Sequence, residues 1–235
     1  MRNHMDKLFI DCSVFTIMIV IGGSVLMIMP VETDIRTKII SAAYNLIGRY
    51  GYGKTTMADL AKACGMSPGN LYRYFPGKLD IAEQLAQQAF DEELAALRAV
   101  VRKPGLSATE RLKVFFCTQL RVTHAKLSED SKIFEIAEII KRERPDLSNQ
   151  NLARIRALLV EILSAGNASG EFDIPDVVSA AEMIQCATMK YHYPQLFSRL
   201  SLEDLEHELR GVIGLILQGI SGSKASRATA KATTR

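Results

Sequence analysis

The sequence predicts an all-α fold in which an N-terminal three-helix unit is joined to a larger C-terminal helical bundle. After Pro30, apolar residues recur at spacings of three and four, with capping residues and Gly or Pro stops between the periodic segments. No run of alternating β-branched residues in that region is long enough to indicate a sheet. At 235 residues, the chain is long enough to bury a substantial core.

The first three predicted helices are short and closely spaced. Thr56–Asp59 has the form of a capping box that opens the second helix, and Gly65 ends it. Ser67 caps the third helix, and Pro68 fits its first position. The three helices are expected at residues 34–50, 57–64 and 67–75.

Six further helices are expected to form the bundle. Capping boxes, proline stops and glycine stops set their limits at residues 78–101, 112–125, 130–142, 148–164, 175–191 and 202–218. Residues 166–173 are expected to form a turn-rich loop. The tail from residue 221 to 235 contains basic residues without acids and has no apolar period, so it is expected to be disordered.

Residues 1–30 do not follow the helical pattern. An apolar run without charged side chains fills most of this segment, and its length approaches that of a transmembrane span. One interpretation is an over-extended coding start, with Met27 and Met29 as alternative start residues. The other is a membrane anchor over residues 8–29.

Several function classes are excluded by what the sequence lacks. The four cysteines lie far apart, and no Cys/His cluster has metal-ligand spacing, so we expect neither a disulfide framework nor a metal site. No G-x-S-x-G, H-E-x-x-H or phosphate-loop motif is present. We therefore expect no catalytic residues and no cofactor. The protein is predicted not to be an enzyme.

The second and third helices, joined by Gly65 and Met66, have the layout of a helix-turn-helix motif. At 100° per residue, setting Leu71 inward turns Gly69, Asn70 and Arg73 outward. Arginine and asparagine can form paired hydrogen bonds with guanine and adenine edges in the major groove. An arbitrary pair of short helices is the alternative explanation of this layout.

Four residues around this motif are predicted to contact DNA phosphates. Tyr72 and Tyr74 flank the outward face, where their hydroxyls point toward the groove walls. Thr56 and Lys78 each stand at a helix start, beside free backbone N–H groups. Partial burial against the following long helix is the alternative for either tyrosine.

Residues 55–78, TTMADLAKACGMSPGNLYRYFPGK, resemble the DNA-binding segment of the tetracycline-repressor (TetR) family, and the likeness covers about residues 34–85. The departures from the family pattern are Leu60, Cys64, Met66 and Tyr74. The resemblance implies base reading by Ser67, Pro68, Asn70 and Arg73, and phosphate contacts by Thr56, Tyr72, Tyr74 and Lys78. It also implies a TetR-like fold and a homodimeric repressor with an effector site in the C-terminal domain.

The last predicted helix carries more apolar surface than one face can bury, so it needs two partners. The predicted dimer interface, a four-helix packing across a twofold axis, comprises Ala181, Ile184, Thr188, Leu209, Gly211 and Gly214. Apolar residues with a few polar tips are candidates for an effector pocket: Phe116, Phe134, Met183, Cys186, Met189 and His192. The alternative is that most of these are simply core residues.

Four parts are therefore expected: an apolar extension (1–30), a helix-turn-helix DNA-binding domain (31–80), an effector-binding and dimerisation domain (81–220) and a disordered basic tail (221–235). The predicted function is a cytoplasmic, homodimeric repressor that binds a palindromic operator in double-stranded DNA and responds to a small molecule. One alternative is a membrane-tethered DNA-binding regulator. Another is a helical ligand-binding or scaffold protein that has lost DNA binding.

Overall fold

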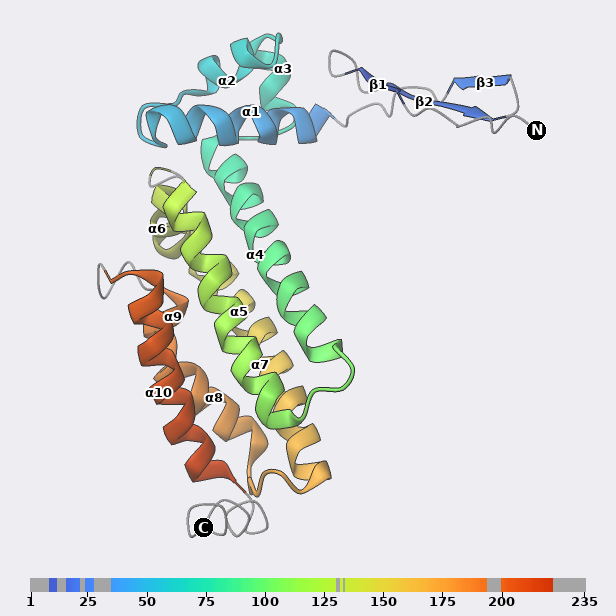
Figure 1. The fold of residues 1–235 in the computed structure, drawn as a ribbon. Helices are drawn as coiled ribbons and strands as arrows, with labels where there is room; N and C mark the ends of the chain where they lie inside the picture. The colour runs from blue at the N-terminus through green and yellow to red at the C-terminus, as the bar shows by residue number, and fades with distance from the viewer. Residues whose placement is uncertain are drawn as a thin grey trace, which may run out of the picture.

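The computed structural model describes residues 9–11, 16–21, 24–27, 35–129, 132, 134–193 and 200–221 (Figure 1). From residue 35 onward the named elements are helices, so the all-α class is confirmed for this part of the chain. The basic tail expected to be disordered begins at Ser221, and its residues 222–235 lie outside the described ranges.

Three short strands, which the sequence analysis did not predict, lie in the apolar N-terminal segment. β1 (Phe9–Asp11), β2 (Thr16–Ile21) and β3 (Ser24–Met27) pair antiparallel in that order, with Met18 opposite Phe9 on one side and Met27 on the other. The β-branched residues of β2 favour this extended form. An anchor of the expected kind would instead be helical over β2 and β3. None of the helices in the described part of the chain is long and apolar enough to cross a membrane.

The N-terminal helical unit consists of α1 (Ile35–Tyr50), α2 (Met57–Ala63) and α3 (Pro68–Tyr72). All three lie within one or two residues of the predicted ranges, except that α3 ends early and continues as a hydrogen-bonded turn to Phe75. The inward faces of the three helices meet in one apolar cluster that includes Ile39, Leu60 and Leu71. We call α1–α3 the reader.

The bundle begins with a long helix, α4 (Lys78–Arg102), which leaves the reader and runs along one side of the bundle (Figure 1). α5 (Ala108–Glu129) and α7 (Pro145–Ser169) pack along it. The remaining helices are α6 (Phe134–Glu143), α8 (Val177–Ala187), α9 (Met189–His192) and α10 (Leu202–Ile220). In Figure 1, α8 and α10 lie on the side of the bundle away from α4.

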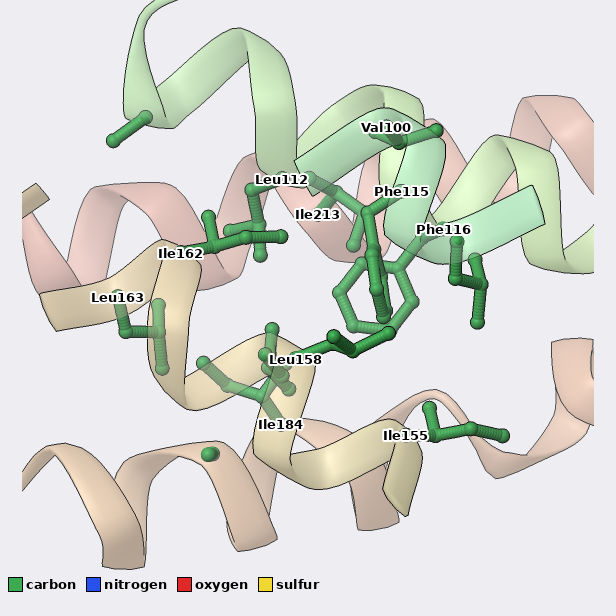
Figure 2. Packing of buried hydrophobic residues seen from close by; sticks show 14 of the residues in the cluster. Val100, Leu112, Phe115, Phe116, Ile155, Leu158, Ile162, Leu163, Ile184 and Ile213 are labelled. Carbon is green, nitrogen blue, oxygen red and sulfur yellow. The ribbon is translucent and has the colours of Figure 1, made fainter. Parts of the chain in front are cut away.

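The bundle core forms where α4, α5, α7, α8 and α10 face one another (Figure 2). Phe115 and Phe116 from α5 meet edge to face, with ring centroids 5.4 Å apart. Leu158 and Ile162 from α7 and Ile213 from α10 belong to the same buried cluster. Burial of this apolar surface is the main stabilising contribution to the bundle.

α6 belongs to the bundle by sequence order, but two of its side chains complete the reader. Ile136 and Ile140 are buried in the reader's apolar cluster, together with Ile81 and Leu85 from the start of α4. The division expected at residue 80 therefore runs through the middle of a packed cluster. The reader alone does not close its own core.

The predicted helix over residues 175–191 is broken at Thr188. The Thr188 hydroxyl donates to the carbonyl of Ile184 at 2.8 Å, and the residue leaves helical geometry at φ −102° and ψ 7°. Threonine side chains that bond back to the preceding turn compete with the helical backbone bonds. The break separates α8 from α9 and turns His192 and Tyr193 toward α4.

The loop predicted over residues 166–173 is shorter than expected, because α7 continues to Ser169 and ends at Gly170 with φ +75°. A Cβ at Gly166 would overlap the ring of Phe172, so only glycine fits there. The Asn167 side chain bonds both the N–H and the carbonyl of Ile174, at 3.1 and 2.8 Å. This compact arrangement explains why the segment combines small and polar residues.

Candidate functional site

The turn between α2 and α3 is fixed by backbone geometry that the sequence signals anticipate. Gly65 has φ +67°, and the N–H groups of Gly65 and Met66 bond to the carbonyls of Lys62 and Ala61, at 3.1 and 2.9 Å. This pattern is a Schellman motif, which requires a left-handed residue at Gly65. The Ser67 hydroxyl then accepts the Asn70 N–H at 3.3 Å and starts α3.

The outward face of α3 has the composition expected for base reading. Leu71 is fully buried against the reader core, while Ser67, Pro68, Gly69 and Arg73 are exposed and Asn70 is half-buried. In the described part of the chain, the Arg73 guanidinium makes no ion pair or side-chain hydrogen bond. A Cβ at Gly69 would meet no atom within 4 Å, so the protein's own packing does not require glycine here.

Arg36 from α1 holds the end of α3 in place, which the sequence analysis missed. Its guanidinium donates to the Tyr74 carbonyl at 2.8 Å and lies 4.4 Å from the centroid of the Phe75 ring. Contacts of this kind depend on the folded arrangement of two separate helices. No local pattern in the sequence signals them.

Thr56 forms the predicted capping box with Asp59. The hydroxyl and the backbone N–H of Thr56, which were expected to contact phosphate, are both bonded within this box. Its hydroxyl donates to the Asp59 carboxylate at 2.6 Å and accepts the Asp59 N–H at 3.1 Å, while its own N–H donates to the same carboxylate at 3.0 Å. Hydrogen bonds from Thr56 hold the pKa of Asp59 below its usual value. A phosphate at α2 would therefore compete with Asp59 for the donors of Thr56.

Lys78 starts α4 as predicted, but its ammonium group reaches back to the loop between α1 and α2. The Nζ atom donates to the carbonyls of Tyr52 and Thr55, at 2.6 and 2.8 Å, and lies 4.2 Å from the Tyr52 ring centroid. Burial lowers the pKa of Lys78. An ammonium group has three donors, so one remains for an anion after these two bonds.

The two predicted phosphate-contacting tyrosines differ in accessibility. Tyr72 is 51 % exposed, whereas Tyr74 is half-buried and packs against the reader cluster. The partial burial considered as the alternative therefore applies to Tyr74, although it leaves part of this side chain accessible.

A cavity of about 330 Å³ lies where α4, α5, α6 and α9 meet beside the reader. Apolar side chains from α4, α5 and α6 form most of its wall, including Leu85, Phe90, Val122 and Ile136. Tyr44 from α1 also lines it. The cavity therefore touches both the bundle and the reader.

Of the six predicted effector-pocket residues, His192 lines this cavity, whereas Phe116, Met183, Cys186 and Met189 do not. Phe116 is buried in the bundle core, Met183 is 58 % exposed on α8, and Cys186 is exposed. Met189 is half-buried outside the lining, and the side chain of Phe134 lies outside the described residues. Apolar character alone does not distinguish a core position from a cavity wall.

Glu93 is a buried acidic residue of the cavity that the sequence analysis missed. It is buried at 6 % exposure, and its Oε1 atom accepts hydrogen bonds from His192 Nε2 at 3.1 Å and from Gln119 Nε2 at 3.2 Å. A signal was available: Glu93 stands four residues after Ala89 and four before Leu97, within the inward apolar stripe of α4. A charged residue in such a stripe marks a functional or specifically paired position.

Four of the predicted dimer-interface residues lie inside the protomer instead. Ala181, Ile184, Thr188 and Leu209 are buried against the bundle core and are not available to a second copy. Gly211 is exposed and Gly214 is half-buried. The outward stripe of α10 is instead Gly211, Leu215 and Gly219, with Leu215 69 % exposed.

Comparison with known proteins links both halves of the molecule to one family. Residues 39–85 match the family described as bacterial regulatory proteins of the tetR family, and residues 108–213 match the tetracyclin repressor-like C-terminal domain. These two matches together cover most of the chain, including the reader and most of the bundle.

Relatives and solved structures agree with these matches. The chain is 26 % identical over 139 residues to the HTH-type transcriptional repressor KstR2 of Rhodococcus jostii, covering 58 % of this chain and 67 % of that protein. It is 24 % identical over 191 residues to the HTH-type transcriptional regulator UidR of Escherichia coli, covering 77 % of this chain and 92 % of that protein.

A TetR/AcrR-family regulator from Thermobifida fusca has a similar fold, with a TM-score of 0.62 at 24 % identity over 79 % of this chain and 98 % of that one.

Proposed function

Because this chain belongs to the tetracycline-repressor family of bacterial regulators, we propose that it is a homodimeric, ligand-responsive repressor that reads a palindromic DNA site. Like its relatives, it is a DNA-binding transcriptional regulator and not an enzyme. The observation that carries the proposal is the exposed face of α3 around an uncommitted Arg73. The same proposal assigns its action to the cytoplasm, because its partner is DNA.

Base reading is assigned to Ser67, Pro68, Gly69, Asn70 and Arg73. Arg73 and Asn70 have the donors and acceptors for paired contacts with guanine and adenine. Gly69 lets the helix backbone come close to the base edges, since it presents no side chain there. All five residues belong to the cap, first turns or end of α3, the part of a recognition helix that enters the major groove.

Phosphate contacts are assigned to Thr56, Tyr72, Tyr74 and Lys78. These residues differ in how accessible they are and in how many of their donors are free. Tyr72 is the more exposed of the two tyrosines. Lys78 can give one N–H to a phosphate while its other two hold the loop between α1 and α2. Lys78 would thus couple the phosphate contact to the position of α2.

Dimerisation is assigned to the exposed faces of α8 and α10, centred on Leu215. An apolar side chain 69 % exposed between two exposed glycines offers a surface onto which another helix can pack closely. Two copies joined there would present two α3 helices to successive half-sites of a palindrome. Leu215→Asp is expected to shift the protein toward monomer in sedimentation velocity, whereas Val114→Asp, an exposed position on α5, is not.

The effector site is assigned to the cavity between α4, α5, α6 and α9. Ile136 lines this cavity and also belongs to the reader core, so a ligand that displaces α6 would move the reader. Glu135, the residue before it, accepts the Tyr52 N–H at 2.9 Å and ties the same helix to the loop between α1 and α2. Such a ligand would act by favouring one of two reader positions with different DNA affinity.

The test begins by selecting bound sequences from a random DNA pool, then measures binding of the selected site over a range of salt concentrations. Arg73→Ala is expected to relax the preference at one base pair, with a loss of about 1–3 kcal/mol there. Lys78→Ala should weaken binding to all sequences alike and reduce the salt slope by about one. Lys113→Ala, which removes an exposed charge on α5, is the control and should change neither. Equal, sequence-independent losses from the Arg73 and Lys78 variants would contradict this division of roles.

A further inference from the structure

The cavity lined by Glu93 and His192 has an asymmetric wall that restricts the chemistry of its ligand. Most of its surface is apolar, contributed by residues such as Leu85, Phe90 and Val122. Polar side chains enter it from α4, from α5 and from the segment that begins with His192: Gln88, Glu92, Glu93, Thr123, Lys126, His192 and Tyr193. A ligand with an apolar body and a single polar group would match both parts of the wall.

The protein donates hydrogen bonds to only one of the two carboxylate oxygens of Glu93. Both of its hydrogen bonds reach Oε1, from His192 and Gln119. Among the residues that the structure describes, none donates a hydrogen bond to Oε2. The side chain is 8 % exposed, and Oε2 is not among the fully buried polar atoms that lack a partner, so part of this exposure lies on that oxygen. A ligand in the cavity that supplies a donor to Oε2 replaces its limited hydration with a charge-assisted hydrogen bond.

The carboxyl group of Glu93 is ionised in this setting. Burial alone raises its pKa, but the hydrogen bonds from His192 and Gln119 and the charge of His192 outweigh burial, so the pKa lies below the ordinary value. Next to the carboxylate, burial and the charge of Glu93 raise the pKa of Tyr193 to about 12. The Tyr193 ring stacks on His192 with centroids 4.3 Å apart. Tyr193 therefore stays protonated and adds no negative charge.

The remaining charges of the wall cancel each other. Lys126 forms an ion pair with Glu92 at 3.1 Å and donates to the Ala89 carbonyl at 2.8 Å, so its ammonium group is already engaged. His192 is the other basic group that faces the cavity, and it bonds to Oε1. His192 offsets the negative charge of Glu93 only when its imidazole is protonated, so with a neutral imidazole the charge left for a ligand is that of Glu93.

We propose that the ligand of this cavity is an apolar molecule carrying one protonated amine, which donates to Oε2 of Glu93 while its hydrocarbon part lies against α4, α5 and α6. This inference rests on the proposed effector site and specifies its chemistry. An ionised carboxylate ligand of the same shape is repelled by Glu93. A neutral alcohol can donate to Oε2, but it leaves the buried charge uncompensated.

The experiment compares three probes that share one hydrocarbon chain: octylamine, octanol and octanoate. At about pH 7 the amine is protonated and the acid is ionised. Calorimetric titration of the full-length protein without DNA is expected to give the order octylamine, then octanol, then octanoate. An octylamine advantage over octanol of about ten- to a hundredfold is expected for a charged rather than a neutral donor. Equal binding of the amine and the alcohol, tighter binding of octanoate or no binding of octylamine would each overturn the proposal.

Two matched variants assign the preference to one residue. Glu93→Gln keeps the size of the side chain but removes its charge, and it is expected to abolish the advantage of octylamine over octanol. Glu92→Gln removes the same charge one residue away, at a carboxylate 70 % exposed and paired with Lys126, and should keep the advantage. Retention of the amine preference in Glu93→Gln, checked for folding by circular dichroism, would overturn the assignment. If Glu93→Gln fails to fold, the probe order in the unmodified protein decides the proposal.

Failure of this inference is distinguishable from failure of the proposed function. Operator binding by α3 is measured in the absence of any probe, so it succeeds or fails independently of the cavity. A protein that binds its selected DNA site but prefers octanoate would remain a repressor with a differently charged ligand. A protein that binds octylamine but no DNA would instead contradict the proposed function.

Discussion

The reader and the bundle obtain their stability in different ways. The bundle buries long helices against one another, and its core is closed at one end by the compact segment from Gly166 to Ile174. The reader has three short helices whose shared core is completed by Ile136 and Ile140 from α6. Because the reader is small, it has too little apolar interior of its own, and side chains from α6 complete its core. The helix that supplies them also lines the ligand cavity.

Among the predicted changes, truncating Ile140, which α6 contributes to the reader core, is expected to have the largest effect on stability. Ile140 is fully buried in the reader cluster, so Ile140→Ala should destabilise the protein by about 2–5 kcal/mol. Hydrogen exchange should show the loss of protection first at the amides of α1 and α2. The control Lys141→Ala, an exposed position on the same helix as Ile140, should leave the protection of these amides unchanged. A loss confined to the bundle amides would show that the reader core is independent of α6.

The second prediction concerns the segment that closes the bundle. Gly166→Ala places a methyl group where the Phe172 ring lies, and the expected destabilisation is about 1–3 kcal/mol or more. Thermal unfolding measures it. Phe172→Leu in the same protein should recover part of the loss, because the smaller side chain vacates the space. Wild-type stability of Gly166→Ala would mean that the ring moves aside at no cost.

The matching glycine in the reader should behave in the opposite way. A methyl group at Gly69 meets no atom of the protein, and alanine favours a helix by about 0.5–1 kcal/mol over glycine. Gly69→Ala is therefore expected to leave unfolding unchanged or slightly raise the melting temperature, while DNA binding weakens. Fluorescence anisotropy with the selected DNA site checks the second part. Unchanged affinity would show that the α3 backbone does not approach the bases at this point.

The smallest expected effect is the pH dependence of Glu171. Burial raises its pKa, but the N–H groups of Ala108 and Thr109, at 2.9 and 3.0 Å, outweigh burial and leave the pKa below its ordinary value. A lowered pKa gives stability that is present above the unfolded-state value of about 4.3 and is lost as the pH falls through the folded-state value. Glu171→Gln should remove about 0.5–1 kcal/mol at neutral pH and less in acid.

Asp173→Asn is the control for the Glu171 experiment. Asp173 is an exposed acid in the same segment, and its side chain makes no hydrogen bond within the described ranges. Urea unfolding of both variants at several pH values makes the comparison. A Glu171→Gln loss that stays constant from neutral to acidic pH would show that the carboxylate charge is not what stabilises the start of α5.

The sequence predicted the elements whose signals are local. The capping box at Thr56, the glycine at Gly65 and the Ser67-Pro68 start are each defined within a few residues, and all three appear in the structure. Leu71 was correctly placed inward because helical periodicity needs only the helix itself. The reader could therefore be predicted almost residue by residue.

Features that depend on distant contacts were not predicted. Periodicity places Leu209 on the inward stripe of α10 and Leu215 off it, but it does not show which apolar surface packs inside the protomer and which is left for a second copy, so Leu209 was assigned to the dimer interface although it is fully buried. The packing of α6 against the reader joins residues about a hundred positions apart in the chain, as with Ile40 and Ile140. The stripe of α4 marks Glu93 as an inward acid, but its partners come from α5 and α9, which no pattern in α4 reveals.

The position of Ile136 and Ile140 has a consequence for building hybrid regulators. A graft that exchanges only the DNA-binding segment, ending near residue 85, would carry α1–α3 to a host whose own α6 was shaped for a different surface. Such a hybrid would expose apolar side chains or leave voids at the junction. Transferring α6 together with the segment preserves the fit, and it also transfers one wall of the cavity, so specificity for DNA and response to a ligand are expected to move as a unit.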